Sequence, residues 1–214
     1  MRTMTRSYGD PCGVARGLDV IGERWALLVV RDLLLGPKRF NDLLGGLHGA
    51  SPNVLTQRLH DLIDLGVVRR RDLGPPARVR LYELTEWGHE LEPLLLHLGR
   101  WGSQAPSPPQ GELGIDSLLL SLKAGFDPAR ADELSGTYQL GVDGDTYLVR
   151  VADSSLQIER RAARQPSATL STDLDTLRQV IDGRIAIPAA QQSSRLHIDG
   201  DEPSVRHLTD LLQP

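Results

Sequence analysis

The spacing of apolar residues in the first third of the chain predicts a series of helices. Apolar positions recur with a helical period over residues 14–21, 25–35 and 40–47. Ser51-Pro52 then supplies a favourable N-cap and a proline at the first helical position, and Gly66 stands where the next helix would end. The pattern therefore predicts four helices, and only a short break separates the last two.

A predicted hairpin and one more helix complete the first half. Residues 67–73 and 79–84 are strand-like and flank a Gly-Pro-Pro turn, which indicates a β-hairpin. Thr85 is expected to cap a helix whose apolar residues, from Trp87 to Trp101, keep a helical spacing. Two short helices joined by a tight turn and followed by a hairpin with a basic tip are the parts of a winged helix-turn-helix.

The second half has a different pattern. Residues 102–112 contain three prolines and no apolar residue larger than alanine, so they cannot continue a helix or join a core. Beyond them the chain mixes strand-like runs with short helices. The expected strands are 137–142, 146–151, 155–160, 168–171 and 196–198, and the expected helices are 115–122, 174–181 and 205–212. We predict an antiparallel sheet with helices packed on it, which is an α+β fold.

Length and composition fit two folded domains. The chain has 214 residues, of which 40% are hydrophobic and 24% charged, as in an average folded protein. We expect a mainly α winged helix-turn-helix domain at 1–102, a linker at 103–112 and an α+β domain at 113–214. No apolar run approaches the ~18 residues that would span a bilayer. Because no signal peptide is recognised either, a membrane protein is not expected and the predicted location is the cytoplasm.

Charge is divided unevenly between the two halves. The net charge of −4 by itself argues against a nucleic-acid partner. Residues 1–104, however, carry 14 basic against 12 acidic side chains, whereas residues 105–214 carry 10 against 16. Five arginines lie on the predicted hairpin, namely Arg69, Arg70, Arg71, Arg78 and Arg80. This hairpin is where a minor groove or phosphates would lie, and the acidic second half is not expected to touch DNA.

The helix after Ser51 is predicted to have one apolar and one polar face. The apolar face holds Leu55, Leu59, Leu62 and Ile63, and the polar face holds Asn53, Thr56, Gln57, His60 and Asp64. Amide and hydroxyl side chains suit base edges in a major groove, although an ordinary solvated helix has the same character. Arg58 lies between the faces, so phosphate binding and an intramolecular ion pair are both open to it. Ser51 and the free amides of the first turn would meet a phosphate.

Five motifs between Cys12 and about Gly102 carry a family resemblance. They are Cys12-Gly13-Val14-Ala15, Leu18-Asp19-Val20-Ile21-Gly22-Glu23-Arg24-Trp25, Gly36-Pro37-Lys38-Arg39-Phe40, Ser51-Pro52-Asn53-Val54-Leu55-Thr56-Gln57-Arg58-Leu59, and Tyr82-Glu83-Leu84-Thr85-Glu86-Trp87-Gly88. This stretch resembles the HxlR-type transcriptional regulators, relatives of the MarR winged-helix proteins. The resemblance implies a homodimer in which the first and last helices of the winged domain pack across a twofold axis. Each subunit would then bind one half-site of a palindrome.

Two surfaces are expected on the winged domain, one for DNA and one for a second copy of the chain. The residues expected at the DNA are Lys38, Arg39, Ser51, Asn53, Thr56, Gln57, Arg58, His60, Arg70, Arg78 and Arg80. The residues expected at the dimer interface are Val14, Leu18, Leu91, Leu94, Leu95, Leu98 and Trp101. The alternative for the last helix is that its apolar stripe packs against the core of its own subunit.

Cys12 is the only residue for which we consider a redox role. It is the single cysteine, so any disulfide must cross subunits or involve a small thiol. Some HxlR-type regulators respond to oxidants or electrophiles through a cysteine at this position, and a thiol near a helix N-terminus can have a depressed pKa. The alternative is that Cys12 is a small buried hydrophobe.

Other chemistry is not expected. The six histidines are dispersed, and no metal-binding spacing, phosphate loop or catalytic constellation is recognised. We therefore predict no enzymatic activity, no metal and no cofactor.

The second half carries a separate resemblance. Its marks are Gly136-Thr137-Tyr138-Gln139-Leu140, Ala168-Thr169-Leu170-Ser171-Thr172-Asp173, Asp182-Gly183-Arg184 and Leu196-His197-Ile198-Asp199-Gly200-Asp201. It resembles the sterol carrier protein-like lipid-binding fold, which implies an apolar cleft for a small hydrophobic ligand. The alternative is that the domain dimerises or recruits a partner and that side chains fill its interior. Phe126, Tyr138 and Tyr147 are expected in the pocket wall, with core packing as the alternative.

The sequence thus favours a dimeric transcriptional regulator that binds double-stranded DNA at a palindromic operator and responds to a small hydrophobic effector. One alternative is a lipid or metabolite carrier in which the winged domain serves assembly. Another is a regulator that responds to thiol oxidation through Cys12.

Overall fold

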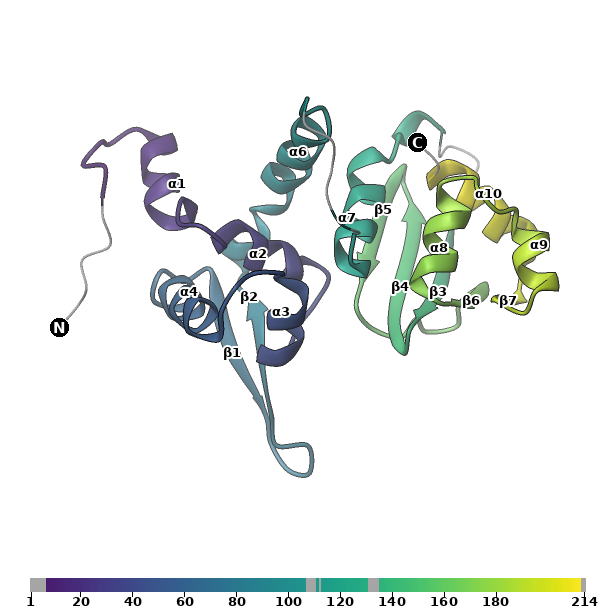
Figure 1. Ribbon diagram of the computed structural model, residues 1–214, viewed down its shortest axis with the longest axis horizontal. Coiled ribbons are helices and arrows are strands. Elements are labelled where there is room, and N and C mark those ends of the chain that lie inside the picture. Colours follow the sequence, from purple (N-terminus) through teal and green to yellow (C-terminus); the bar gives the residue numbers. More distant parts are fainter. Residues whose placement is uncertain (1–6, 107–110, 112, 131–134, 213–214) are drawn as a thin grey trace. The chain divides into compact units, whose positions relative to one another are not determined.

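The computed structural model describes residues 7–106, 111, 113–130 and 135–212 (Figure 1). The chain divides into two compact units, Met1–Leu95 and Leu96–Pro214. Helix α6 (Glu92–Ser103) crosses this division and contains no buried residue. Within the expected linker, residues 107–110 and 112 lie outside the described residues.

The first unit has the predicted order of elements. It consists of α1 (Gly13–Ile21), α2 (Ala26–Leu34), α3 (Phe40–Gly46), α4 (Pro52–Asp64), the hairpin strands β1 (Val68–Leu73) and β2 (Val79–Leu84), and α5 (Glu86–His89). The strands are antiparallel from the pair Val68 and Leu84 to the pair Leu73 and Val79. The winged helix-turn-helix fold is therefore confirmed.

The single helix predicted after Thr85 is instead two helices. Thr85 does cap α5, because its Oγ1 accepts a hydrogen bond from the Gly88 amide at 3.0 Å. The helix then tightens, with the Leu91 amide bonded to the Gly88 carbonyl. Pro93 follows and has no amide hydrogen to offer the preceding turn. The break between α5 and α6 has this local cause.

A buried carboxylate ties α2 to both ends of α3. Asp32 is 2% exposed and accepts a hydrogen bond from Arg31 Nε at 2.8 Å, while Lys38 Nζ lies 3.7 Å from its other oxygen. A Cβ added at Gly46 would collide with Asp32 Oδ2. The Lys38 backbone also exchanges two hydrogen bonds with Tyr82 of β2. One charge pair thus fixes α3 and the hairpin relative to α2.

In its described residues, the second unit combines one sheet with five helical segments that follow α6. Its helices are α7 (Ile115–Gly125), the 3-10 turn η1 (Pro128–Arg130), α8 (Leu174–Ile181), α9 (Ile187–Gln192) and α10 (Glu202–Leu212). Its strands are β3 (Gly136–Val142), β4 (Asp145–Ala152), β5 (Ser155–Glu159), β6 (Ala168–Thr172) and β7 (Leu196–Gly200). The predicted α+β class is confirmed. The short helix α9 was not predicted, since six residues give too weak a periodic signal.

The sheet is mixed, so the prediction of a wholly antiparallel sheet was wrong. The strand order is β5-β4-β3-β6-β7, and β3 pairs with β6 in parallel. A parallel pair requires a long connection, which β4 and β5 provide before the chain returns beside β3. The remaining pairs are antiparallel, and Asp143-Gly144 joins β3 to β4 with positive φ at both residues, as a tight hairpin requires.

Two neighbouring glycines of α3 test the Asp32 arrangement. We predict that Gly46→Ala destabilises the first unit by about 1–3 kcal/mol, because the new methyl group must displace a buried, ion-paired carboxylate. Gly45→Ala is the matched control, since its Cβ would meet open space. Alanine exceeds glycine in helix propensity by up to about 1 kcal/mol, so the control should be neutral or stabilising.

Urea unfolding followed by tryptophan fluorescence measures both variants. All three tryptophans lie between residues 25 and 101, so the signal reports on the first half of the chain. Equal stability of the two variants would contradict the role given to Asp32.

Candidate functional sites

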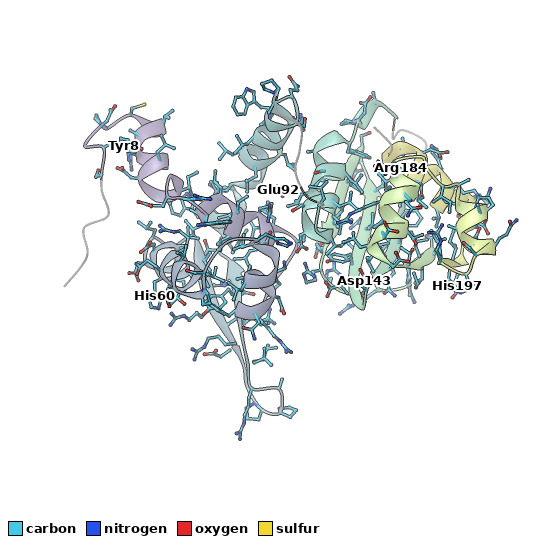
Figure 2. All side chains as sticks on the ribbon, in the orientation of Figure 1. Tyr8, His60, Glu92, Asp143, Arg184 and His197 are labelled. Atoms are coloured by element: carbon cyan, nitrogen blue, oxygen red, sulfur yellow. The ribbon has the colours of Figure 1, made fainter. Side chains whose placement is uncertain are left out.

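Helix α4 presents a polar face at the surface of the first unit. Its N-terminus is capped by Ser51, whose Oγ accepts a hydrogen bond from the Val54 amide at 3.3 Å. Its buried residues are Leu55, Leu59 and Leu62, and its exposed residues include Asn53, Thr56, Gln57 and His60. Figure 2 labels His60 on this helix. The face therefore offers amide, hydroxyl and imidazole groups to a partner.

Asp61 engages two of the expected DNA-contacting side chains. Gln57 Nε2 donates to Asp61 Oδ1 at 2.8 Å, and Arg58 donates to the other carboxylate oxygen at 3.0 Å. Arg58 also lies 3.7 Å from Glu23, and its side chain is only 13% exposed. Phosphate binding and an intramolecular ion pair were both predicted for Arg58. The structure shows the ion pair. To form two hydrogen bonds with a base, the Gln57 amide would have to break its hydrogen bond to Asp61.

The wing, defined here as residues 68–84, carries both paired and unpaired arginines. The paired ones are Arg69 and Arg71, which both bond Glu83, and Arg80, which bonds Asp72. Arg70 and Arg78 are exposed, and within the described part of the chain no ion pair is recorded for either. Arg78 has a positive φ of 43° at the end of the turn. These two arginines are the charges that the wing leaves available to a phosphate.

Lys38 is corrected from a DNA-contacting residue to a structural one. Its side chain is 7% exposed and is paired with Asp32, so its charge is not available at the surface. The sequence did not reveal this because Asp32 lies within an apolar run six residues earlier. Arg39 is exposed, and its amide donates to Asp42 Oδ2 at 3.2 Å at the start of α3.

The residues expected at a dimer interface form exposed apolar faces on α1 and α6. Val14 is 71% exposed and Trp101 is 75% exposed, which is unusual for side chains of this kind. The other exposed members are Leu18, Leu94 and Leu98, while Leu91 and Leu95 are half-buried. Large exposed apolar residues on one helix are typical of a surface that another protein covers.

Cys12 is exposed at the N-terminus of α1, so it is not a buried hydrophobe. The backbone amides of Val14 and Ala15 in the first turn of α1 lower the pKa of its thiol. Donors of this kind stabilise the thiolate, which is the nucleophilic form.

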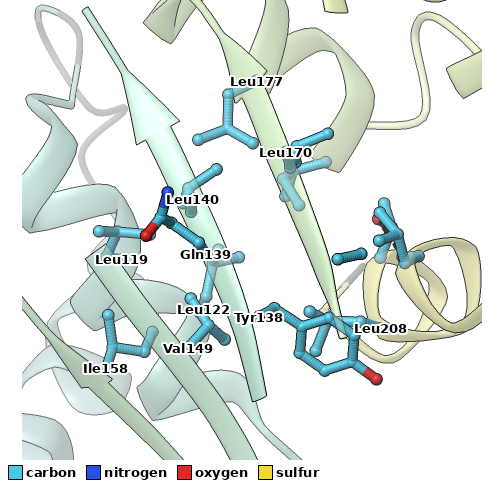
Figure 3. Close-up of a pocket in the computed structure, with 14 residues that line it drawn as sticks. Leu119, Leu122, Tyr138, Gln139, Leu140, Val149, Ile158, Leu170, Leu177 and Leu208 are labelled. Carbon is cyan, nitrogen blue, oxygen red and sulfur yellow. Dashed lines mark hydrogen bonds between the residues drawn. The ribbon is translucent and has the colours of Figure 1, made fainter. Parts of the chain in front are cut away.

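The second unit contains an apolar cavity of about 50 Å³ (Figure 3). Its wall is formed by Leu119, Leu122, Tyr138, Gln139, Leu140, Val149, Ile158, Ala168, Leu170, Leu177, Ile181, Val205, Leu208 and Thr209. These residues come from the sheet and from α7, α8 and α10. Known ligand pockets have volumes of about 300–1,000 Å³. The cavity is therefore nearly closed in this conformation.

Tyr138 lines this cavity as expected. Its ring lies beside Leu208 of α10 (Figure 3). Burial raises the pKa of Tyr138, and nearby Asp201 adds to the rise. The polar residues Gln139 and Thr209 also line the cavity and were not predicted. Their side chains carry no pattern that distinguishes them from other sheet and helix residues.

Phe126 and Tyr147 are not among the residues that line the cavity, so their assignment to its wall is corrected. Phe126 is half-buried directly after α7. Tyr147 is fully buried in a polar cluster, where the Arg160 guanidinium stacks on its ring at 4.8 Å and also bonds Asp116 and Asp145. Burial, followed by the charge of Asp116, raises the pKa of Tyr147. This cluster fastens α7 to the sheet.

The described residues contain no group of three or more histidine, cysteine or acidic side chains placed to hold a metal ion. None of their helices has both the length and the apolar character needed to cross a membrane.

Comparison with protein families matches each half of the chain separately. The model of the HxlR-like helix-turn-helix family matches residues 20–109. The model of the SCP-2 sterol transfer family matches residues 117–213.

Individual relatives agree with the first of these matches. The chain is 36% identical over 109 residues to the uncharacterized HTH-type transcriptional regulator sll1512 of Synechocystis, covering 47% of this chain and 79% of that protein. It is 36% identical over 94 residues to the uncharacterized HTH-type transcriptional regulator YvaP of Bacillus subtilis. This match covers 44% of this chain and 86% of that protein. Among solved structures, the redox regulator HypR in its oxidized form is 32% identical, covering 45% of this chain and all of that one, with a TM-score of 0.43.

The lowered pKa of the Cys12 thiol predicts how its alkylation depends on pH. Because the folded chain lowers the thiol pKa, the pH midpoint of alkylation should be lower in the native protein than in the same protein unfolded in urea. Iodoacetamide labelling across a pH series, quantified by intact-mass spectrometry, measures both midpoints. A native midpoint equal to or above the unfolded one would contradict the effect of the α1 amides.

Proposed function

Since the chain belongs to the HxlR-like helix-turn-helix family, we propose that it is a transcriptional regulator that binds double-stranded DNA sequence-specifically as a homodimer in the cytoplasm. The observation that carries this proposal is the exposed polar face of α4 beside a wing with two unpaired arginines. Its relatives are named transcriptional regulators, which favours a non-enzymatic role.

In this proposal α4 reads bases and its surroundings bind phosphates. Asn53, Thr56 and Gln57 are exposed on α4 and have the donor and acceptor groups that pair with adenine and thymine edges. His60 lies further along the same helix. The remaining expected contacts are to the DNA backbone, through Ser51 with the first-turn amides of α4 and through Arg39, Arg70, Arg78 and Arg80. Arg80 would have to exchange its bond to Asp72 for a phosphate.

The proposed dimer covers the apolar faces of α1 and α6. Their exposed valine, leucine and tryptophan side chains would be removed from water by a second copy, and apolar burial of this kind drives association. Two copies related by a twofold axis would present two α4 helices to a palindromic operator.

The second unit is proposed to bind a small hydrophobic effector. We assign the DNA-binding and dimerisation domain to residues 1–102, a linker to 103–112 and the effector domain to 113–214. The match to the SCP-2 family and the apolar lining of the cavity support this assignment. An effector changes DNA binding only if it binds the two states of the dimer with different affinity. Oxidation of the exposed Cys12 thiol is the second candidate switch.

Two substitutions separate base reading from phosphate binding. Gln57→Ala should relax sequence preference and weaken binding to the preferred operator by ~1–3 kcal/mol, because a base edge loses its partner. Arg78→Ala should weaken all sequences alike and lower the slope of log K against log salt by about 1. An operator selected from a random duplex pool and a scrambled duplex serve as probes in fluorescence anisotropy.

Gln157→Ala, at an exposed position on β5, is the control for loss of a glutamine. Equal losses from Gln57→Ala and Arg78→Ala on both duplexes would contradict the assigned roles. Salt-independent binding by the wild-type chain would instead favour a carrier that uses the winged domain for assembly.

Native mass spectrometry of the full chain tests assembly and the effector together. We expect a dimer that carries one hydrophobic compound per chain, released under denaturing conditions. Leu98→Asp should give a monomer, because it places a charge in the proposed interface. A wild-type monomer would exclude the proposed dimer, and a ligand-free dimer would exclude a tightly held effector.

A further inference from the structure

The connection between α1 and α2 contains an unusual backbone conformation. Trp25 adopts a left-handed conformation with φ of 78° immediately before α2. A large side chain rarely occupies this region, and such outliers persist only where surrounding contacts hold them, often at functional sites. The contacts around Trp25 therefore bear on what this connection does.

Two contacts attach this connection to the DNA-facing elements. Glu23 forms an ion pair with Arg58 of α4 at 3.7 Å. The Trp25 ring lies against the turn between α3 and α4, since a Cβ added at Gly49 would be 3.8 Å from its Cη2. The residue between them, Arg24, is consequently held close to the N-terminal half of α4.

Arg24 is exposed and its guanidinium stacks on the Trp25 ring, 5.2 Å from the ring centroid. Stacking on an aromatic face restricts a long side chain while leaving its N–H groups directed outward. Within the described residues no ion pair is recorded for Arg24, and the adjacent carboxylate of Glu23 is paired with Arg58. Arg24 thus offers a positioned charge that no acidic neighbour neutralises.

Most other cations near α4 are neutralised within the chain. Lys38 is buried against Asp32, and Arg58 is paired with Asp61 as well as Glu23. Guanidinium groups bind phosphate oxygens bidentately, and phosphates flank any helix that enters a major groove. We propose that Arg24, supported by the Trp25 ring, is a phosphate-binding residue of the DNA-contacting surface. This inference rests on the proposed function.

The salt dependence of binding tests Arg24 without knowledge of the operator. The probe is a fluorescein-labelled duplex of random sequence, titrated with the full chain at several sodium chloride concentrations. Each lost phosphate contact should lower the slope of log K against log salt by about 0.9 for every protomer bound. Arg24→Ala and Arg24→Gln should both show this decrease, whereas Arg24→Lys should keep the wild-type slope because the charge remains.

Arg184→Ala is the matched control. It removes one exposed arginine from the second unit, which is not expected to touch DNA, and should leave the slope unchanged. If Arg24→Ala and Arg24→Gln keep the wild-type slope, or if Arg184→Ala lowers it equally, the role of Arg24 is overturned while DNA binding stands. If the wild-type chain shows no salt-dependent binding to the duplex, the proposed function itself fails.

Discussion

The buried ion pair between Asp32 and Lys38 is the interaction on which the geometry of the first unit depends. Asp32 belongs to α2, while Lys38 lies just before α3 and shares backbone hydrogen bonds with Tyr82 of β2. Removing one partner of a buried pair typically costs about 3–5 kcal/mol, because the other charge is left without compensation. The orientation of α3, and through the following turn that of α4, is therefore coupled to the orientation of the wing.

Several basic side chains of the same unit are paired with acidic side chains of the chain itself. Arg58 and three wing arginines are bonded to acidic neighbours, which explains how a basic hairpin can belong to a half of the chain with almost balanced charge. The sequence-independent part of the affinity for DNA increases with the number of basic side chains that are free to contact phosphates. In the proposed function, pairing part of the positive charge within the chain lowers the gain from random DNA, so a larger share of the discrimination would fall to the polar face of α4.

Local signals in the sequence predicted most of the first unit. Ser51-Pro52 and Gly66 act within one or two turns of their own position, and the limits of α4 followed from them. Features that depend on distant partners were not predictable in this way. The burial of Lys38 requires Asp32 on another helix, and the parallel pairing of β3 with β6 joins segments separated by two strands. Tyr147 was predicted to line the pocket because it is aromatic. In the structure, the Arg160 guanidinium stacks on its ring and makes Tyr147 part of a polar cluster.

The nearly closed cavity has a consequence for how such a protein would respond to concentration. If the second unit binds an effector as proposed, a ligand of useful size must first separate α10 or α7 from the sheet, and the free energy of that opening subtracts from its intrinsic affinity. The opening therefore sets a detection threshold, below which the closed form prevails whatever the chemistry of the ligand. Substitutions that weaken the packing of α10 on the sheet would shift the response to lower concentrations without altering the apolar lining that selects the ligand.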